Sequence, residues 1–162
     1  MVVDADAINV LARDPAPVRA ARARPVLTPH PGEMSRLLGV ETTAVQSDRA
    51  GVARRFAVEQ RCTLVLKGAR SVIAESSGRL WINPTGNPGM ASGGMGDVLS
   101  GILGGLLAQG LPPPEAACLG VYLHGAVADR AAADGDVGLV ASDVLAGLRQ
   151  GLHALRAALG DG

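Results

Sequence analysis

The sequence predicts an α/β domain in which a mostly parallel sheet is layered between helices. Three observations lead to this prediction: short apolar segments alternate with helical patterns in the first half, the last third has the pattern of consecutive helices, and 48% of the 162 residues are hydrophobic. That length and content are enough for one hydrophobic core. Because no repeat and no linker-like segment divides the chain, we expect one domain over residues 1–162.

The elements expected before residue 62 are short, and each is bounded by a recognisable signal. They are a strand at Val2–Asp6 that ends in carboxylates, a strand at Pro25–His30 that proline stops, a helix at Gly32–Gly39 that glycine ends, and one amphipathic helix between Thr43 and Gln60. We expect Thr43 or Ser47 to cap the last of these helices.

The elements expected after residue 62 begin with a strand and a hairpin and end in helices. The strand is Thr63–Leu66, and the hairpin pairs Ser71–Glu75 with Arg79–Asn83. The helices are Asp97–Gln109, Pro113–Ala133 and Ser142–Leu159, the last with Ser142 as its N-cap. Strands that alternate with helices, followed by a helical run, are typical of a layered α/β fold.

A glycine-rich segment, residues 83–97, precedes the first of these C-terminal helices. Five glycines and two prolines in fifteen residues exclude regular structure, yet the segment leads directly into the apolar, helically spaced stretch Val98–Leu103. Glycines let backbone N–H groups converge on an anion, and the amino end of a helix adds its dipole. We therefore expect this loop to bind a phosphate group.

Asp97 is the carboxylate at the junction of this loop and its helix. It has two interpretations: a base beside the bound phosphate, or the N-cap of the helix, since Asp is a favoured capping residue. A capping turn needs one or two glycines, whereas this loop has five, together with two prolines that stiffen it. The length of the loop therefore favours the first interpretation.

Composition argues against several classes of protein. A net charge of zero without a basic run, together with one Phe, one Trp and one Tyr, argues against nucleic acid or an anionic membrane surface as a partner. The longest apolar stretch, Val98–Ala108, is interrupted by serine and glycine and is too short to span a membrane, and no signal peptide is recognisable. Cys62 and Cys118 lack metal-ligand spacing, so we expect reduced core cysteines in a cytoplasmic protein.

Two other segments carry candidate polar groups. Asp4 and Asp6 are two residues apart on the first strand and would face the same side, which suits a shared cation or substrate. The alternative is that Asp6 caps the helix that follows. Thr28–Glu33 presents the imidazole of His30 and the carboxylate of Glu33 where a strand ends. Its alternative is a turn with a capping glutamate.

The remaining candidates are one lysine and two histidines. Lys67 is the only lysine and follows the apolar run Leu64–Leu66, where α/β proteins place groups that face a ligand. We expect His124, among apolar helix neighbours, to be a core residue, and His153 to be a surface residue. The sequence has no Ser-His-Asp arrangement, zinc spacing or Walker loop.

Four segments together resemble the ADP/ATP-dependent NAD(P)H-hydrate dehydratases of the ribokinase-like superfamily. They are Asp4–Asn9, Thr28–Glu33, Leu66–Ser71 and Gly86–Asp97, and their order and spacing agree from Asp4 to about Leu148. The Gly86–Asp97 segment separates this family from sugar kinases. The resemblance implies a ribokinase-like layered fold and the repair of hydrated NADH or NADPH: a nucleotide phosphorylates the hydroxyl of the hydrate, and phosphate then leaves.

The resemblance also implies roles for particular residues, with ADP or ATP as co-substrate. Lys67, Gly68, Ala69, Arg70 and Ser71 match the segment that lines the nucleotide, Gly96 matches the anion-hole glycine, and Gly94 belongs to the same nucleotide-binding loop. Asp97 matches the catalytic base that contacts the substrate hydroxyl, and His30 matches a substrate contact. Glu33 matches the acidic residue of an Asn-x-x-Glu element associated with magnesium, although His30 replaces the Asn here.

One departure from the family concerns the start of the chain. Family members carry a long further segment before the strand that begins here at Val2, so we expect the N-terminal part of the domain to be absent. An unpaired sheet edge would then favour a homo-oligomer or association with that missing part. Two alternatives stay open: a vitamin-precursor kinase of the same superfamily, such as a hydroxyethylthiazole kinase, and a catalytically silent nucleotide-binding remnant.

Overall fold

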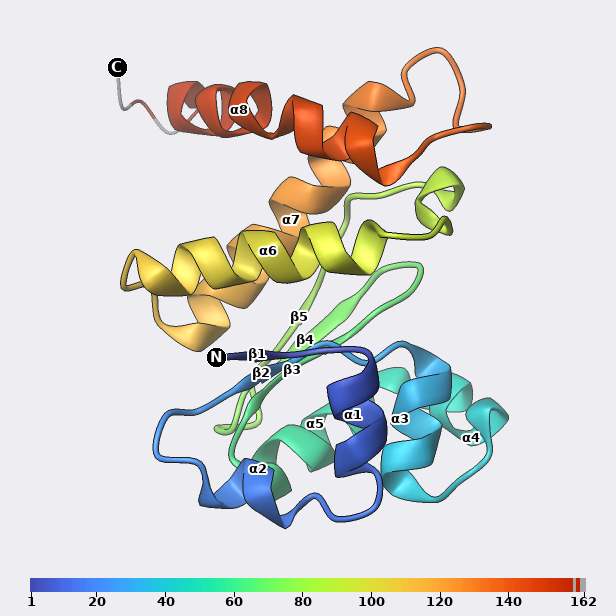
Figure 1. Cartoon of the computed structure of the whole chain (residues 1–162), viewed down its shortest axis with the longest axis vertical. Helices are drawn as coiled ribbons and strands as arrows, with labels where there is room; N and C mark the ends of the chain where they lie inside the picture. Colours follow the sequence, from blue (N-terminus) through green and yellow to red (C-terminus); the bar gives the residue numbers. More distant parts are fainter. Residues whose placement is uncertain (159, 161–162) are drawn as a thin grey trace.

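A five-stranded sheet lies between two groups of helices in the computed structural model, which describes residues 1–158 and 160 (Figure 1). The strand order is β1-β2-β3-β4-β5. β1 (Val2–Val3), β2 (Val26–Leu27) and β3 (Thr63–Leu66) are parallel, whereas β4 (Val72–Ala74) and β5 (Leu80–Ile82) add two antiparallel pairings. The predicted layered fold and hairpin are confirmed, and the hairpin makes the sheet mixed.

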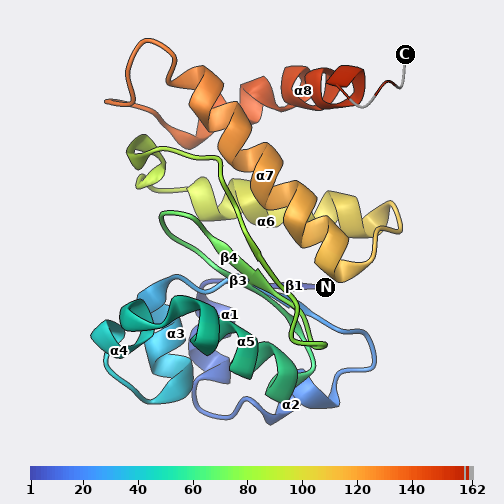
Figure 2. The same cartoon turned by 180° about the vertical axis from the view of Figure 1, so that it is seen from behind.

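One face of the sheet is covered by the first five helices (Figure 2). They are α1 (Asp6–Leu11), α2 (Ala16–Ala20), α3 (Pro31–Leu38), α4 (Thr42–Ser47) and α5 (Arg49–Gln60). Leu27, Leu64 and Leu66 project from the strands into this layer and are fully buried there. Since successive strand residues point to opposite faces, their neighbours must supply the other core.

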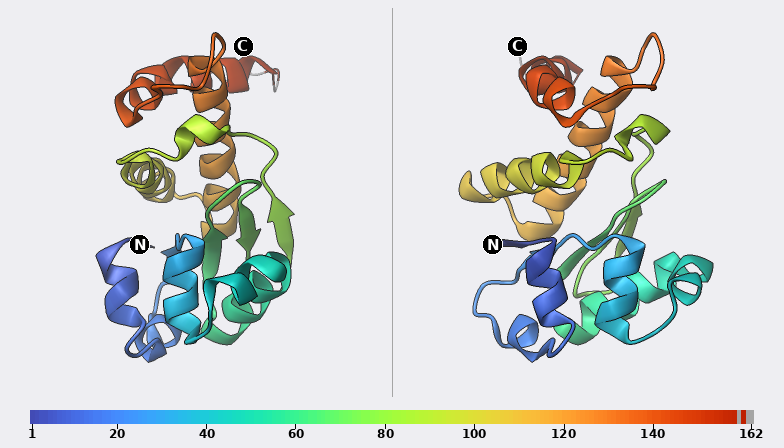
Figure 3. Two further views of the ribbon diagram at one scale, coloured as in Figure 1. Left: turned by 90° about the vertical axis from the view of Figure 1, so that its right-hand side faces the viewer. Right: turned by 45° about the vertical axis from the view of Figure 1, so that its right-hand side comes forward.

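The opposite face is covered by α6 (Met95–Ala108) and α7 (Pro113–Ala131). Val26, Val65 and Ile73, which alternate with the residues of the first core, pack against these two helices. A short 3₁₀ helix, η1 (Pro88–Met90), lies in the glycine-rich segment before α6. The last helix, α8 (Ala141–Ala158), packs on α6 and α7 away from the sheet (Figure 3).

The predicted helix between Thr43 and Gln60 is wrong in its continuity, because it is two helices. The break is at Asp48, whose backbone is not helical (φ −143°, ψ 60°) and whose side chain accepts the N–H of Gly51 at 2.9 Å. Asp48 therefore caps α5, rather than Thr43 or Ser47. An Asp side chain that bonds a nearby backbone N–H competes with a continuous helix at that point.

Other boundaries also differ from the predicted ones. The strands predicted at Val2–Asp6 and Pro25–His30 are only Val2–Val3 and Val26–Leu27, because α1 and α3 begin soon after them, and α2 was not predicted. α6 begins at Met95, two residues before Asp97, and α7 ends at Ala131. α8 begins at Ala141, so Ser142 is inside the helix and is not its N-cap; Leu159, the predicted end, lies outside the described residues. In the described part of the chain, none of the helices is long and apolar enough to cross a membrane.

Candidate active site

The carboxyl ends of β1 and β3 bring together a lysine and a carboxylate that are far apart in the sequence. Asp4 follows β1 and Lys67 follows β3, and Lys67 Nζ lies 2.8 Å from Asp4 Oδ1. Ser100 of α6 donates its hydroxyl to Asp4 Oδ2 at 2.8 Å. Glu33 of α3 places Oε2 3.8 Å from Lys67 Nζ. Asp4 therefore links the sheet to α6, and Lys67 links it to α3.

This cluster is largely buried and contains two carboxylates and one ammonium group. Burial alone would raise the pKa of Asp4, but hydrogen bonds from Lys67 and Ser100, together with the charge of Lys67, hold that pKa below its ordinary value. Asp4 is therefore ionised at neutral pH. Two carboxylates, Asp4 and Glu33, then surround one ammonium group, so a cation that approached this cluster would be attracted.

His30 and Glu33 form a reciprocal capping box at the start of α3. Nδ1 of His30 accepts N–H groups from Gly32 at 3.0 Å and Glu33 at 3.3 Å, and Glu33 Oε2 accepts the N–H of His30 at 2.7 Å. The imidazole nitrogen thus accepts the bonds that the amide oxygen of an N-cap Asn would accept. Its side chain is 51% exposed, and its other ring nitrogen, Nε2, lies 3.5 Å from Glu33 Oε1.

The amino end of α6 is formed by Gly94, Met95, Gly96 and Asp97. Gly94 is the N-cap with φ 83°, a conformation that favours glycine. The first backbone bond of the helix runs from the Val98 N–H to the Gly94 carbonyl. Within the described part of the chain, the N–H groups of residues 95–97 therefore have no backbone acceptor, as the start of a helix requires.

Asp97 is the third residue of α6, so the alternative in which it caps the helix is wrong. Its side chain is exposed and makes no hydrogen bond or ion pair with any residue that the structure describes. Gly96 lies next to the charged cluster: a Cβ on Gly96 would be 3.5 Å from both Lys67 Nζ and Asp4 Oδ2. Asp97 is thus a free carboxylate in the first turn of α6, and the residue before it, Gly96, lies next to Lys67.

The glycine-rich segment before α6 is fixed to α7. Asp129 of α7 accepts the Gly86 N–H at 2.8 Å and the Asn87 side-chain amide at 2.9 Å. Thr85 donates its hydroxyl to the Tyr122 carbonyl at 2.9 Å. These bonds hold a segment without regular structure in one place relative to the helices.

The segment after β3, residues 67–71, is held by an arginine from α5. The guanidinium of Arg49 donates to the carbonyls of Leu66, Lys67 and Ala69 at 3.1 to 3.2 Å. Ser71 closes the far end of the segment by donating its hydroxyl to the Gly68 carbonyl at 3.1 Å. The predicted nucleotide-lining residues therefore have a fixed backbone.

Some predicted candidates do not belong to this cluster. Asp6 is exposed in the first turn of α1 and Ala5 occupies the N-cap position, so the capping interpretation of Asp6 is wrong, and Asp6 does not share a strand with Asp4 as predicted. His124 is buried in α7, where desolvation lowers its pKa to about 4, and its Nε2 has no partner among the described residues. It is a core residue as predicted, although an unsatisfied one. His153 is exposed, as predicted.

The sequence analysis missed Ser100, Arg49 and Asp129. Ser100 is a polar residue one helical turn after Gly96 in an otherwise apolar stretch, and that signal was available. Arg49 and Asp129 gave no such signal, because in the sequence they look like ordinary charged residues on an exposed helix face.

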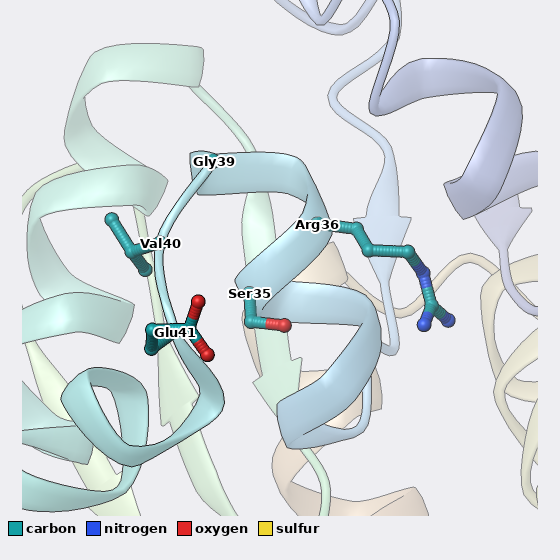
Figure 4. Close-up of a pocket in the computed structure, with 5 residues that line it drawn as sticks. All are labelled: Ser35, Arg36, Gly39, Val40 and Glu41. Atoms are coloured by element: carbon teal, nitrogen blue, oxygen red, sulfur yellow. The ribbon is translucent and has the colours of Figure 1, made fainter.

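An open pocket lies at the carboxyl end of α3, between that helix and α4 (Figure 4). Ser35, Arg36, Gly39, Val40 and Glu41 line it. It is at the opposite end of α3 from His30 and Glu33, so it is separate from the charged cluster.

Comparison with known proteins gives consistent results. The family model of the NAD(P)H-hydrate dehydratases matches residues 1–150. A bifunctional NAD(P)H-hydrate repair enzyme from Moorella thermoacetica is 54% identical over 145 residues, which cover 89% of this chain and 27% of that protein. An ADP-dependent (S)-NAD(P)H-hydrate dehydratase from Neisseria meningitidis is 47% identical over 131 residues, which cover 80% of this chain and 44% of that protein.

Solved structures agree with these sequence matches. The ADP/ATP-dependent NAD(P)H-hydrate dehydratase from Bacillus subtilis, co-crystallised with ATP and Mg²⁺, has a TM-score of 0.82 and 34% identity, covering 94% of this chain and 54% of that one. A hydroxyethylthiazole kinase from Pyrococcus horikoshii has a TM-score of 0.70 at 20% identity, which shows a shared fold alone. The chain spans about half the length of these structures and less of the curated relatives, and it belongs to the NAD(P)H-hydrate dehydratase family.

Proposed function

We propose that this chain carries the nucleotide and phosphate side of an NAD(P)H-hydrate dehydratase site. One observation supports this proposal above the others: Gly96, at the amino end of α6 and next to the free carboxylate of Asp97, lies beside Lys67, in a chain of this family. The Neisseria and Bacillus relatives are named as ADP- and ADP/ATP-dependent dehydratases, so adenine nucleotide is the proposed co-substrate.

In the proposed reaction, Asp97 accepts the proton of the hydrate hydroxyl as that oxygen attacks the terminal phosphorus of the nucleotide. The shortened nucleotide leaves with the electron pair of the broken P–O bond. N–H groups at Gly94 to Gly96 hold the transferred phosphoryl group, and the Lys67–Ser71 segment lines the nucleotide. Phosphate and a proton then leave the hydrate, which restores the double bond of NADH or NADPH. Phosphoryl transfer of this kind depends on positioning and charge neutralisation more than on covalent help. We assign His30 a contact with the hydrate.

Magnesium fits this site as an ion that accompanies the nucleotide, since the Bacillus relative was crystallised with ATP and Mg²⁺. Glu33 fits direct coordination poorly, because Oε2 already accepts the His30 N–H at 2.7 Å and lies near Lys67. We therefore propose that Glu33 would help to hold magnesium near the nucleotide by its negative charge. The described residues contain no group of three side chains that would hold a metal alone, and the nucleotide phosphates would supply the remaining oxygens. Such an ion would neutralise phosphate charge during transfer.

We also propose that the chain is a cytoplasmic protein that works in association, either with a copy of itself or with the N-terminal segment that its longer relatives carry. The chain covers only 44% of the Neisseria relative. The pocket for the hydrate would then be completed by that second part.

A coupled assay tests the proposed function. The chain, alone and mixed with the N-terminal segment of the Bacillus dehydratase, is given hydrated NADH, magnesium and either ADP or ATP, and the return of NADH absorbance is followed. We expect nucleotide-dependent NADH formation that Asp97→Asn slows by at least about two orders of magnitude. Phosphorylation of hydroxyethylthiazole without NADH formation would instead support the kinase alternative, and no turnover of either substrate would support the remnant alternative.

A further inference from the structure

The guanidinium of Arg49 makes three hydrogen bonds to the short backbone segment at the end of β3. Nη2 donates to the carbonyls of Leu66 at 3.1 Å and Lys67 at 3.2 Å, and Nη1 donates to the carbonyl of Ala69 at 3.1 Å. One side chain from α5 therefore fixes three of four successive carbonyls at the end of β3. A planar fork of donors is suited to this task, whereas an ammonium group is not.

These three bonds also determine where the backbone N–H groups of the segment point. In a planar trans peptide, the N–H of one residue points opposite to the carbonyl of the residue before it. Because the carbonyls of Leu66, Lys67 and Ala69 point at Arg49, the N–H groups of Lys67, Gly68 and Arg70 point away from it. The Lys67 N–H donates to the Pro29 carbonyl at 2.8 Å, whereas those of Gly68 and Arg70 have no acceptor among the described residues.

The backbone conformation of the segment agrees with this picture. Gly68 has φ 137° and Arg70 has φ 54°, and both values are uncommon for residues with side chains. A Cβ on Gly68 would lie 2.9 Å from Arg49 Nη1, so only glycine lets the guanidinium approach this closely. Successive N–H groups in such a turn form a concave surface that binds anions.

Arg49 occupies an unfavourable position for a cation. It is the first residue of α5, where the helix dipole disfavours positive charge. Burial lowers its pKa, and its Nε is buried without a hydrogen-bond partner among the described residues. The helix dipole, the burial of the charge and the unpaired Nε each cost free energy, and no contact within α5 offsets them. The three hydrogen bonds to the carbonyls do.

We propose that Arg49 is a positioning residue for the nucleotide: it turns the segment after β3 so that the N–H groups of Gly68 and Arg70 face the bound phosphates. This inference rests on the proposed function, because that function assigns the segment to the nucleotide. Arg49 acts from behind the segment and does not contact the ligand.

Calorimetry with Mg-ATP tests the inference on the full chain, with Arg49→Lys as the variant and Arg54→Lys as its control. Arg54 is exposed on the same helix and bonds none of these carbonyls. We expect wild-type affinity for the control and a dissociation constant at least about tenfold higher for Arg49→Lys. We also expect a smaller change in turnover at saturating nucleotide than in nucleotide KM. Equal affinity of Arg49→Lys and wild type would overturn the inference alone, whereas no binding by wild type would overturn the proposed function as well.

A second measurement needs no variant and covers a failure of Arg49→Lys to fold. In an amide NMR spectrum of the wild-type chain, Mg-ATP should shift the N–H signals of Gly68 and Arg70. The N–H signal of Lys67, which is already bonded to Pro29, should shift less. Saturating nucleotide that left the Gly68 and Arg70 signals in place would contradict the proposed role.

Discussion

Asp97 combines a structural position with a free functional group. It lies in the first turn of α6, where negative charge is favoured, but Gly94 and not Asp97 forms the cap. Its carboxylate has no partner among the described residues. Removing the charge should therefore change the chemistry far more than the fold.

We predict that Asp97→Asn binds nucleotide nearly as wild type and loses at least about two orders of magnitude in kcat, the usual size of a general-base contribution. Its melting temperature should stay within a few degrees of wild type. Steady-state kinetics, calorimetry and thermal melting of the same preparation measure all three. A variant that kept its turnover number would show that Asp97 is not the base.

The burial of His124 makes the free energy of unfolding decrease as the pH falls. Desolvation lowers its pKa in the folded protein to about 4, whereas the unfolded chain has a pKa of about 6.5. Above pH 6.5 both states are neutral and burial carries no protonation cost. As the pH falls from 6.5 towards 4, the unfolded state binds a proton that the folded state does not, so stability decreases.

We predict that acidification from pH 7 to pH 5 costs wild type about 2 kcal/mol more than it costs His124→Leu. Denaturant unfolding at both pH values measures this difference. His153→Gln is the matched control, because His153 is exposed and should leave the pH dependence of wild type unchanged. Equal acid sensitivity of His124→Leu and wild type would contradict the assignment.

The residues of the site could be predicted from the sequence only where a motif marked them. Lys67 and Asp97 lie at the ends of recognisable segments, and the structure places both at the same end of the sheet. The pairing of Asp4 with Ser100 was not predictable, because it depends on how α6 crosses β1. Arg49 was also not predictable, since its partners are backbone carbonyls that carry no residue identity.

At the scale of elements, the glycine-rich segment depends on α7 for its position. Asp129 holds two donors of this segment, the Gly86 N–H and the Asn87 amide. A segment with few apolar contacts is otherwise expected to open locally.

We predict that Asp129→Ala lowers the melting temperature by about 2–4 °C and speeds hydrogen exchange at Gly86 more than at core amides. Asp134→Ala, another exposed aspartate near the end of α7, is the control and should change neither quantity. If Gly86 exchanged at the same rate in wild type and Asp129→Ala, these two bonds would not anchor the segment.

Apart from the short helix α2, element types were predictable from apolar periodicity and from proline and glycine signals, whereas some boundaries were not. The helix after residue 42 has an apolar pattern that continues through Asp48, yet the Asp48 side chain ends one helix and caps the next. α6 starts at Met95 because Gly94 adopts a positive φ. The sequence has several glycines in this segment and does not show which of them has this conformation. In both cases a local side-chain or backbone choice outweighed the periodic pattern.

At the scale of the whole molecule, the layered α/β arrangement follows from the alternation of strands with helices along the chain. The two antiparallel pairings arise because β4 and β5 each turn back on the strand before them, at one edge of the sheet. β1 lies at the other edge and pairs only with β2, so its outer backbone groups have no strand partner among the described residues. The apolar side chains of Leu145 and Leu152 are also exposed, and they lie on the same face of α8.

We predict that the 162-residue chain self-associates, because an unpaired sheet edge and exposed apolar side chains favour association. Sedimentation velocity over a range of concentrations measures the distribution of species. Leu145→Glu should reduce the associated fraction if α8 contributes to it. A single monomeric species at all concentrations would contradict this prediction.

Nucleotide binding at the amino end of α6 is the central claim, and calorimetry of wild type against Gly96→Val tests it most directly. A Cβ on Gly96 would make ordinary contacts of 3.5 Å with Lys67 and Asp4, so the variant should fold. Its larger side chain would occupy the space between the helix end and Lys67. We predict saturable binding of Mg-ATP by wild type and none by folded Gly96→Val, whereas equal binding by both, or none by wild type, would contradict the account.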